Sequence, residues 1–396
     1  MHSPININEK QEMQTITPRE TLYGHTGNVK GLVHLPGGQR IITCSLDGSL
    51  RLWDLESRAQ IGEDWRDEEE ETAAVYKMAL SPSGQTVVSG SGNGKMKLWD
   101  VETRRVVQKW TGHTENLLSL CWSVDGNRVV SGSWDGIAGV WDIKTGKRIL
   151  KIKTGHKYIS AVTYSPNDTQ IATGGFNKNA VEIWDAKTGE LLTTLQHEYF
   201  VHSLAWTSDA RPKLITASCG PIRIFDTATW QQIAILEGHR SYVNAITLSW
   251  NNRLLASASD DNTVRLWSLD TNLPVGLPLQ HEDEVECTGF SADGKLLVTG
   301  GRDKNAYTWN IHAILKQACL EGLLLTGTII ASKPRLERKA SQGEPEVQRT
   351  PCSSLSDKSF LKADATRYDH DKFGGVDEYS PRFFDGMDIR DDYVRH

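Results

Sequence analysis

Histidine, a hydroxyl residue and aspartate recur along this chain, and together they are the residue types that nucleophilic hydrolysis uses. Each complete set also includes a tryptophan six positions after its aspartate. The complete sets are His25, Thr43, Asp47 and Trp53; His113, Ser131, Asp135 and Trp141; His239, Ser257, Asp261 and Trp267; and His281, Thr299, Asp303 and Trp309. Catalysis needs one such set in a cleft, beside donors that stabilise an oxyanion. Because the set recurs, it predicts a structural element rather than an active site.

The same residues mark an internal repeat of about 42 residues. A Trp-Asp pair or a close variant begins at Trp53, Trp99, Trp141, Trp184, Phe225, Trp267 and Trp309. Gly-His or Gln-His precedes most of these pairs. Seven units at one period indicate a repeat architecture.

Within each repeat the hydrophobic pattern is that of short strands. Segments such as "VKGLVHL", "QRIITCS" and "SLRLWDL" alternate or run apolar over a few residues, and turn sequences such as "PGG" and "LDG" separate them. A fourth segment follows each Trp-Asp pair, as in "QQIAILEGH". Four strands in each of seven repeats predict blades arranged around a channel.

The order of motifs (Gly-His, then Ser/Thr-x-x-x-Asp, then Trp-Asp) resembles the WD-repeat family of β-propellers, over residues 14–311. With its appended tail, the chain looks most like WD-repeat proteins of fungi. The resemblance implies an all-β, seven-bladed propeller of four-stranded blades. It also implies that the four recurring residues form a hydrogen-bonded brace across a blade, and that Trp141 is a core residue.

Closure of the propeller requires a strand from the other end of the chain. The last Trp-Asp variant ends the third strand of repeat seven, and "IHAILKQACLEG" after it reads as a helix. We therefore expect Thr15–Tyr23 to supply the missing strand, which removes an exposed edge. Residues 1–13 are expected to be flexible, and residues 312–396 to be a short apolar segment followed by a disordered tail.

Three repeats depart from the motif. Repeat two lacks Gly-His and has Asn93 where aspartate is expected, and repeat four offers Asn177 or Lys178 there. Repeat five has a shortened turn and Phe225 in place of tryptophan. We expect these three blades to be held by packing alone.

The resemblance also implies which residues contact partners. In the family, these residues flank the valine-like position that follows the histidine by a few residues, or they directly precede the aspartate. Both groups lie at the end of the blades called the top face. The aromatic residues at such positions here are Tyr76, Trp134, Tyr158, Phe176, Phe200 and Tyr242. Other repeats have Leu46, Gly92, Asp260 or Arg302 where Trp134 stands, so the fold does not require an aromatic residue there. The aromatic group is predicted to bind a partner; the alternative is that some members fold back as local core.

An acidic run replaces the Gly-His loop of repeat two, with seven acidic residues in Glu63–Glu71. It is either a solvated loop or a means of steering a basic partner. Either way, its sign argues against a phosphate backbone at the top face.

Composition agrees with an intracellular protein. The net charge is −6, the cysteines are scattered without metal-ligand spacing, and no secretory signal or membrane span is recognised. The chain is expected to be cytoplasmic or nuclear, without a cofactor, a metal or a small-molecule substrate.

The sequence therefore predicts a non-catalytic scaffold that binds other proteins or peptides through its top face, with basic ones among the candidates. Two alternatives stay open: an enzyme with its site at the channel mouth, and a nucleic-acid-associated factor that acts through a complex rather than by direct binding. No Gly-rich phosphate loop or single nucleophile favours the enzyme.

Overall fold

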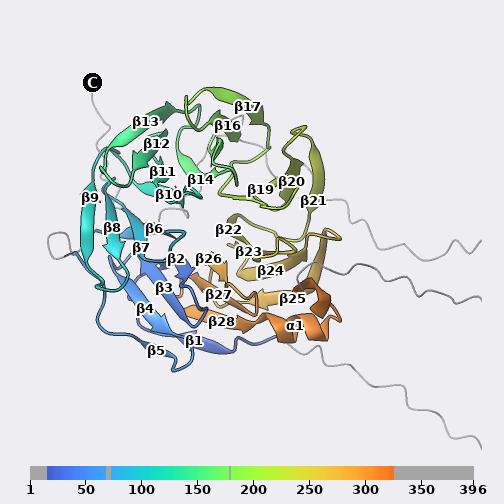
Figure 1. The fold of residues 1–396 in the computed structure, drawn as a ribbon. Coiled ribbons are helices and arrows are strands. Elements are labelled where there is room, and N and C mark those ends of the chain that lie inside the picture. The colour runs from blue at the N-terminus through green and yellow to red at the C-terminus, as the bar shows by residue number, and fades with distance from the viewer. Residues whose placement is uncertain (1–15, 68–72, 178–179, 325–396) are drawn as a thin grey trace, which may run out of the picture. The chain divides into compact units, whose positions relative to one another are not determined.

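Seven antiparallel four-stranded sheets surround a central axis in the computed structural model, which describes residues 16–67, 73–177 and 180–324 (Figure 1). The predicted seven-bladed propeller is confirmed for this part of the chain. The expected flexible N-terminus (1–13), most of the predicted C-terminal tail and part of the acidic run lie outside the described residues.

The first strand of each blade lies closest to the axis, as Figure 1 shows. These inner strands are β2 (Val29–His34), β6 (Val75–Leu80), β10 (Leu117–Trp122), β14 (Ile159–Tyr164), β18 (Ser203–Trp206), β22 (Val243–Leu248) and β26 (Val285–Phe290). Each is hydrogen-bonded to the second strand of its own blade. The residues of these strands are therefore the ones nearest to the central axis.

The second strands are the most buried, because neighbouring blades cover both of their faces. After its first residue, every residue of each second strand is buried, which explains the short apolar and small-residue runs such as "VVSGS". The second strands are β3 (Arg40–Ser45), β7 (Thr86–Ser91), β11 (Arg128–Ser133), β15 (Gln170–Gly175), β19 (Lys213–Ala217), β23 (Leu254–Ser259) and β27 (Leu296–Gly301).

The third strands carry the Trp-Asp pairs and bury the tryptophans between blades. They are β4 (Leu50–Asp54), β8 (Met96–Asp100), β12 (Ile137–Asp142), β16 (Val181–Asp185), β20 (Ile222–Asp226), β24 (Thr263–Ser268) and β28 (Ala306–Asn310). Trp99, Trp141, Trp267 and Trp309 are among the largest fully buried side chains. The repeated tryptophan is thus a core residue of the propeller.

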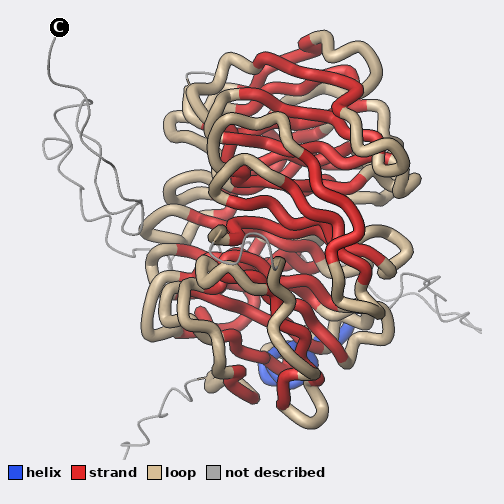
Figure 2. The backbone as a smooth tube through the Cα atoms, turned by 90° about the vertical axis from the view of Figure 1, so that its left-hand side faces the viewer, coloured by secondary structure: helices blue, strands red, loops and turns tan. Residues whose placement is uncertain are grey.

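The outer strands carry more exposed residues than the second strands because one face meets solvent, and in β9 and β13 exposed residues alternate with less exposed ones. They are β5 (Ala59–Gln60), β9 (Val106–Trp110), β13 (Arg148–Lys153), β17 (Leu191–Leu195), β21 (Gln232–Leu236), β25 (Leu273–Gln280) and, in the seventh blade, β1 (Glu20–Leu22). The turns between strands lie at the two ends of the blades, as the view in Figure 2 shows.

The N-terminal strand closes the seventh blade, as predicted. β1 pairs antiparallel with β28, with Leu22 opposite Ala306, and the two strands lie side by side in Figure 1. The paired segment is shorter than the expected Thr15–Tyr23. Leu22 is buried against Trp53 of the first blade, so closure also seals the contact between the first and last blades.

The segment after the last strand is helical, also as predicted. Helix α1 (Ile311–Gln317) begins at Asn310, whose side chain accepts a hydrogen bond from the backbone N–H of Ala313 at 3.0 Å. The 3-10 helix η1 (Glu321–Leu324) follows. Ile311, Ile314, Leu315 and Leu323 are buried in one cluster with core residues of the last two blades. The helix therefore extends the core of the propeller.

Candidate protein-interaction surface

Three blades contain the complete four-residue brace. In blade three, Trp141 Nε1 donates to Ser131 Oγ at 2.8 Å, Ser131 Oγ lies 2.7 Å from His113 Nε2, and His113 Nδ1 lies 2.9 Å from Asp135 Oδ2. Blade one repeats this arrangement with Trp53, Thr43, His25 and Asp47, and blade six with Trp267, Ser257, His239 and Asp261. With Nδ1 protonated, each histidine uses both ring nitrogens.

The electrostatics of the brace stabilise the ionised aspartate. Burial by itself would raise the pKa of Asp47, Asp135 and Asp261, but the hydrogen bond and attraction from the histidine outweigh it, so each pKa is lowered. The hydroxyls of these three blades have no solvent exposure, so a substrate does not reach them. The arrangement holds strands together and is not built to attack a substrate.

The seventh blade does not assemble the fourth predicted set. His281 Nε2 bonds to Thr299 Oγ1 at 2.8 Å and Trp309 Nε1 donates to the same hydroxyl at 3.0 Å, as expected. However, His281 Nδ1 lies 3.2 Å from the carbonyl oxygen of Leu279, and Asp303 accepts a hydrogen bond from Tyr307 Oη instead. The expected bond between His281 and Asp303 was wrong, because Asp303, in the turn before β28, accepts instead from Tyr307 on that strand.

Blades two and four replace the missing aspartate with charges that sequence reasoning missed. In both, the replacement lies on the third strand, directly opposite the brace hydroxyl: Lys97 opposite Ser89, and Glu182 opposite Thr173. Lys97 Nζ lies 2.8 Å from the buried carboxylate of Asp67. Glu182 lies 3.5 Å from His156 Nε2, and burial raises its pKa. The expectation that packing alone holds these blades was therefore wrong.

In every blade except the fifth, the turn between the second and third strands lies beside the residue that precedes the first strand. The backbone N–H of Trp134 donates to Asn116, that of Phe176 to Tyr158, and that of Asp260 to Tyr242, at 2.9–3.1 Å. This repeated contact brings both groups of predicted partner-binding positions to one end of the blades, the top face.

Five of the six predicted aromatic residues form a continuous group there, which we call the aromatic arc. Trp134 contacts Tyr158 edge-on at 6.1 Å between ring centroids, and Tyr158 stacks on Phe176 at 5.5 Å. Phe200 lies 5.4 Å from Phe176 and stacks on Tyr242 at 5.2 Å. The arc crosses blades three to six, so residues more than one hundred positions apart in the chain share one surface.

Six segments of the chain match the family described as WD domain, G-beta repeat: residues 16–54, 68–100, 104–142, 147–185, 230–268 and 275–310. They cover more than half of the chain. This chain belongs to the WD-repeat family. The first three strands of the fifth blade of this WD-repeat propeller, β18 to β20, lie outside the matched segments, and Phe225 replaces the tryptophan there.

The curated relatives of this WD-repeat protein match it over limited regions. Nuclear distribution protein nudF of Aspergillus niger is 32% identical over 170 residues, covering 41% of this chain and 38% of the relative. CCR4-associated factor 4 homolog of Candida glabrata is 27% identical over 195 residues, covering 42% and 33%. Anaphase-promoting complex subunit cdc20 of Dictyostelium discoideum is 30% identical over 137 residues, covering 34% and 27%. The matches thus span well under half of each relative, and the resemblance to fungal proteins stays a prediction.

The six aromatic residues differ in exposure and in their neighbours. Tyr158 is only 8% exposed and forms the base of the arc beneath Trp134, Phe176 and Phe200. Phe176 is 38% exposed. Tyr76 lies apart from the arc, with its ring over Gly92 of its own blade, where an added Cβ would approach it to 2.9 Å. The surface of the arc is therefore formed by Trp134, Phe176, Phe200 and Tyr242.

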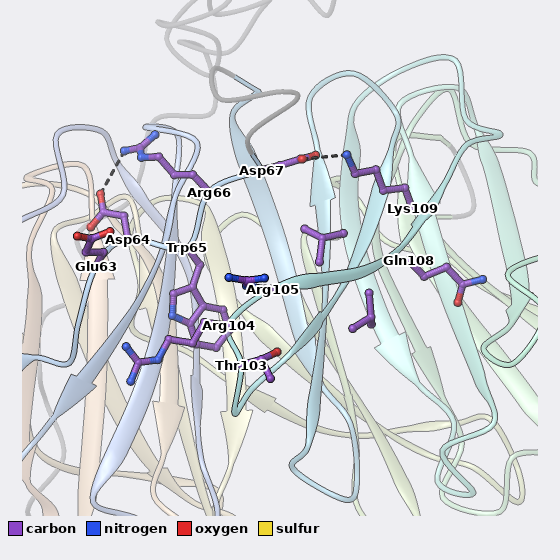
Figure 3. A pocket seen from close by; sticks show the side chains of 12 residues that line it. Glu63, Asp64, Trp65, Arg66, Asp67, Thr103, Arg104, Arg105, Gln108 and Lys109 are labelled. Carbon is purple, nitrogen blue, oxygen red and sulfur yellow. Dashed lines mark hydrogen bonds and ion pairs between the residues drawn. The ribbon is translucent and has the colours of Figure 1, made fainter.

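The described part of the acidic run lines a groove at the outer edge of the first two blades. In Figure 3 this segment faces β9 of the second blade across the groove. Asp64 pairs with Arg51 at 3.0 Å, and Asp67 pairs with Lys109 and Lys97 at 2.8 Å. The groove thus carries both signs of charge, and its described aspartates already bind cations of this chain.

Proposed function

We propose that this WD-repeat protein is a non-catalytic scaffold that binds a partner protein or peptide through the aromatic arc. The observation that carries the proposal is the continuous contact of aromatic rings across four blades of the top face. Partly exposed aromatic residues above a buried base are the type of surface that supplies most of the binding energy at interfaces.

The position of Trp134 supports this function over a purely structural one. The equivalent turn positions of other blades hold Leu46, Gly92, Asp260 and Arg302, and those blades keep the same strand pairing. The blade therefore forms without an aromatic residue at this turn. Burial of the exposed part of Trp134 by a partner would therefore stabilise the complex.

The two alternative functions receive less support. The brace hydroxyls of the three complete sets are fully buried, which argues against a hydrolytic centre built from them. Carboxylates at the top face, such as Glu284 and Asp260, disfavour a phosphate backbone. A role in a nucleic-acid complex then requires a second protein that contacts the nucleic acid.

We also propose a reducing compartment, the cytoplasm or nucleus. Five cysteines in the described residues carry free thiols, which suits such a compartment. The name of one relative, a subunit of the anaphase-promoting complex, supports membership of a multiprotein assembly.

The test compares variants of the arc with a tryptophan at the other end of the blades. Trp134→Ala and Phe200→Ala should retain the melting temperature of the wild type but lose partner proteins in affinity capture. Trp250 lies 45% exposed in the turn between β22 and β23, at the opposite end from Trp134, and Trp250→Ala is the matched control. Stable arc variants that retain every partner would overturn the proposed function.

A further inference from the structure

An acidic cluster adjoins the aromatic arc at Tyr242. Asp260 lies in the turn between β23 and β24, and its backbone N–H donates to the carbonyl oxygen of Tyr242 at 2.9 Å. Asn244 Nδ2 donates to Asp260 Oδ1 and to the carbonyl oxygen of Val285 at 3.0 Å. Asp260 is therefore held at the junction of blades six and seven, directly beside the end of the arc.

Two more carboxylates of the cluster come from the seventh blade and are already paired. Glu286 lies 2.7 Å from Lys30 Nζ, and Glu284 lies 2.8 Å from Arg302 Nε. Lys77 of the second blade adds a further positive charge near Glu286. Arg302 also lies 3.6 Å from Glu286. The positive charges of Lys30, Lys77 and Arg302 therefore lie next to Glu284 or Glu286.

Asp260 has a different environment. The groups that act on it are the neutral amide of Asn244 and the carboxylates of Glu284 and Glu286. Burial, with the repulsion of these carboxylates, raises the pKa of Asp260 to about 7. Among the described residues of the cluster, Asp260 is thus the carboxylate that forms no ion pair, and it lies at the edge of an aromatic surface.

We propose that the partner segment carries a lysine or arginine beside a large apolar side chain. The cation binds at Asp260, and the apolar side chain packs on the arc at Phe176 and Phe200. This inference rests on the proposed function and specifies its ligand. A guanidinium or ammonium group supplies the positive charge that Asp260 lacks, and the adjacent ring of Tyr242 also attracts a cation.

The dimensions of the surface restrict the spacing of the two side chains. Ring centroids are 5.4 Å apart between Phe176 and Phe200 and 5.2 Å apart between Phe200 and Tyr242. An extended chain advances about 3.3 Å per residue. The apolar residue and the cation should therefore lie within about four positions of each other in the partner.

The test begins with a display library of random twelve-residue peptides selected on the full chain. Enriched peptides should contain an aromatic or large aliphatic residue and a lysine or arginine within about four positions. A synthetic peptide from this selection should bind Asp260→Asn about tenfold more weakly than the wild type. The same peptide with its cation replaced by norleucine should not distinguish the two proteins.

Glu190 supplies the matched control, because it lies exposed in the turn between β16 and β17, at the other end of the blades. Glu190→Gln should bind the peptide like the wild type, and thermal melting verifies that Asp260→Asn is folded. Enrichment of apolar peptides without a cation, or affinity that is unchanged in Asp260→Asn, would overturn this inference and leave the proposed function standing. If Trp134→Ala and Phe200→Ala also retain every partner, the proposed function fails as well.

Discussion

At the scale of residues, the two tryptophans around Asp135 have separate roles. Trp141 is 2% exposed, donates to Ser131 and stacks on Trp110 at 6.4 Å between ring centroids. Trp134 lies in the preceding turn, partly exposed, and its ring contacts Tyr158 of the next blade. Burial and hydrogen bonding, rather than residue type, determine what each tryptophan contributes.

Trp141→Ala should therefore lower the free energy of unfolding by about 3–5 kcal/mol, since it leaves a cavity and removes the donor to Ser131. Trp134→Ala should lower it by no more than about 1 kcal/mol. Denaturant titration of both variants measures the difference. Equal losses would show that Trp134 is part of the core.

The aspartates of blades six and seven offer a second matched comparison. Asp261 accepts bonds from His239 and from the backbone N–H of Arg240 with the same oxygen, and from Thr263 with the other. Asp261→Asn replaces one carboxylate oxygen by an NH2 group, which then faces groups that donate to Asp261 in the wild type. The substitution should therefore cost roughly 1–3 kcal/mol of stability.

Asp303→Asn should cost less than about 1 kcal/mol, because its amide can still accept from the N–H of Asn305 and donate to Tyr307 Oη. Chemical denaturation of the two variants gives both values. A larger loss in Asp303→Asn than in Asp261→Asn would contradict the assignment of the brace in blade seven.

At the scale of elements, the two ends of the folded unit stabilise the last blade. β1 supplies its outer strand, and α1 buries Ile311, Ile314 and Leu315 against the last two blades. We propose that the propeller predicted over residues 14–311 folds as one unit with α1 and η1. In this proposal, α1 and η1 are part of the folded domain.

Truncations distinguish the contribution of β1 to stability from that of the terminal segments. Deletion of residues 1–24 removes β1 and should give an aggregating or partly unfolded protein, because β28 then presents an unpaired edge. Deletion of 332–396 should leave the melting temperature nearly unchanged. Deletion of 1–13 is the control for the first truncation. A 25–396 chain that melts like the full protein would contradict closure by β1.

At the scale of the whole molecule, enclosed histidines determine how stability depends on pH. Burial lowers the pKa of five histidines from 6.5 to about 4: His34, His156, His197, His202 and His281. Between these values the unfolded chain binds protons that the folded chain excludes. Asp260 and Glu182 act in the opposite sense, since burial raises the pKa of each carboxyl and lets the folded state hold its proton to higher pH, but they are two groups against five.

The free energy of unfolding should therefore be greatest above about pH 6.5 and fall as the pH decreases toward 4. Urea midpoints measured between about pH 7 and pH 4.5 give this dependence. His197→Asn should reduce its slope, because it removes one of the five groups. A midpoint that is constant or rises on acidification would show that these histidines are protonated in the folded state.

The sequence alone determined the number of blades, the closing strand and the identity of the brace in three blades. These follow from local pattern: the repeat period, the alternation of apolar residues and the spacing of Ser131, Asp135 and Trp141 all act within one blade. Such contacts recur with the repeat, so a single motif predicts each copy.

Only the tertiary structure decided which partners the non-repeating side chains find. Tyr307 binds Asp303, and Lys97 pairs with Asp67, although neither Tyr307 nor Lys97 belongs to the motif. The aromatic arc and the placement of Asp260 near Glu284 of blade seven likewise depend on the angle between neighbouring blades. The physical reason is that these side chains are not part of the repeated motif, so their distances are determined by the packing of side chains and blades rather than by the spacing of the motif along the chain.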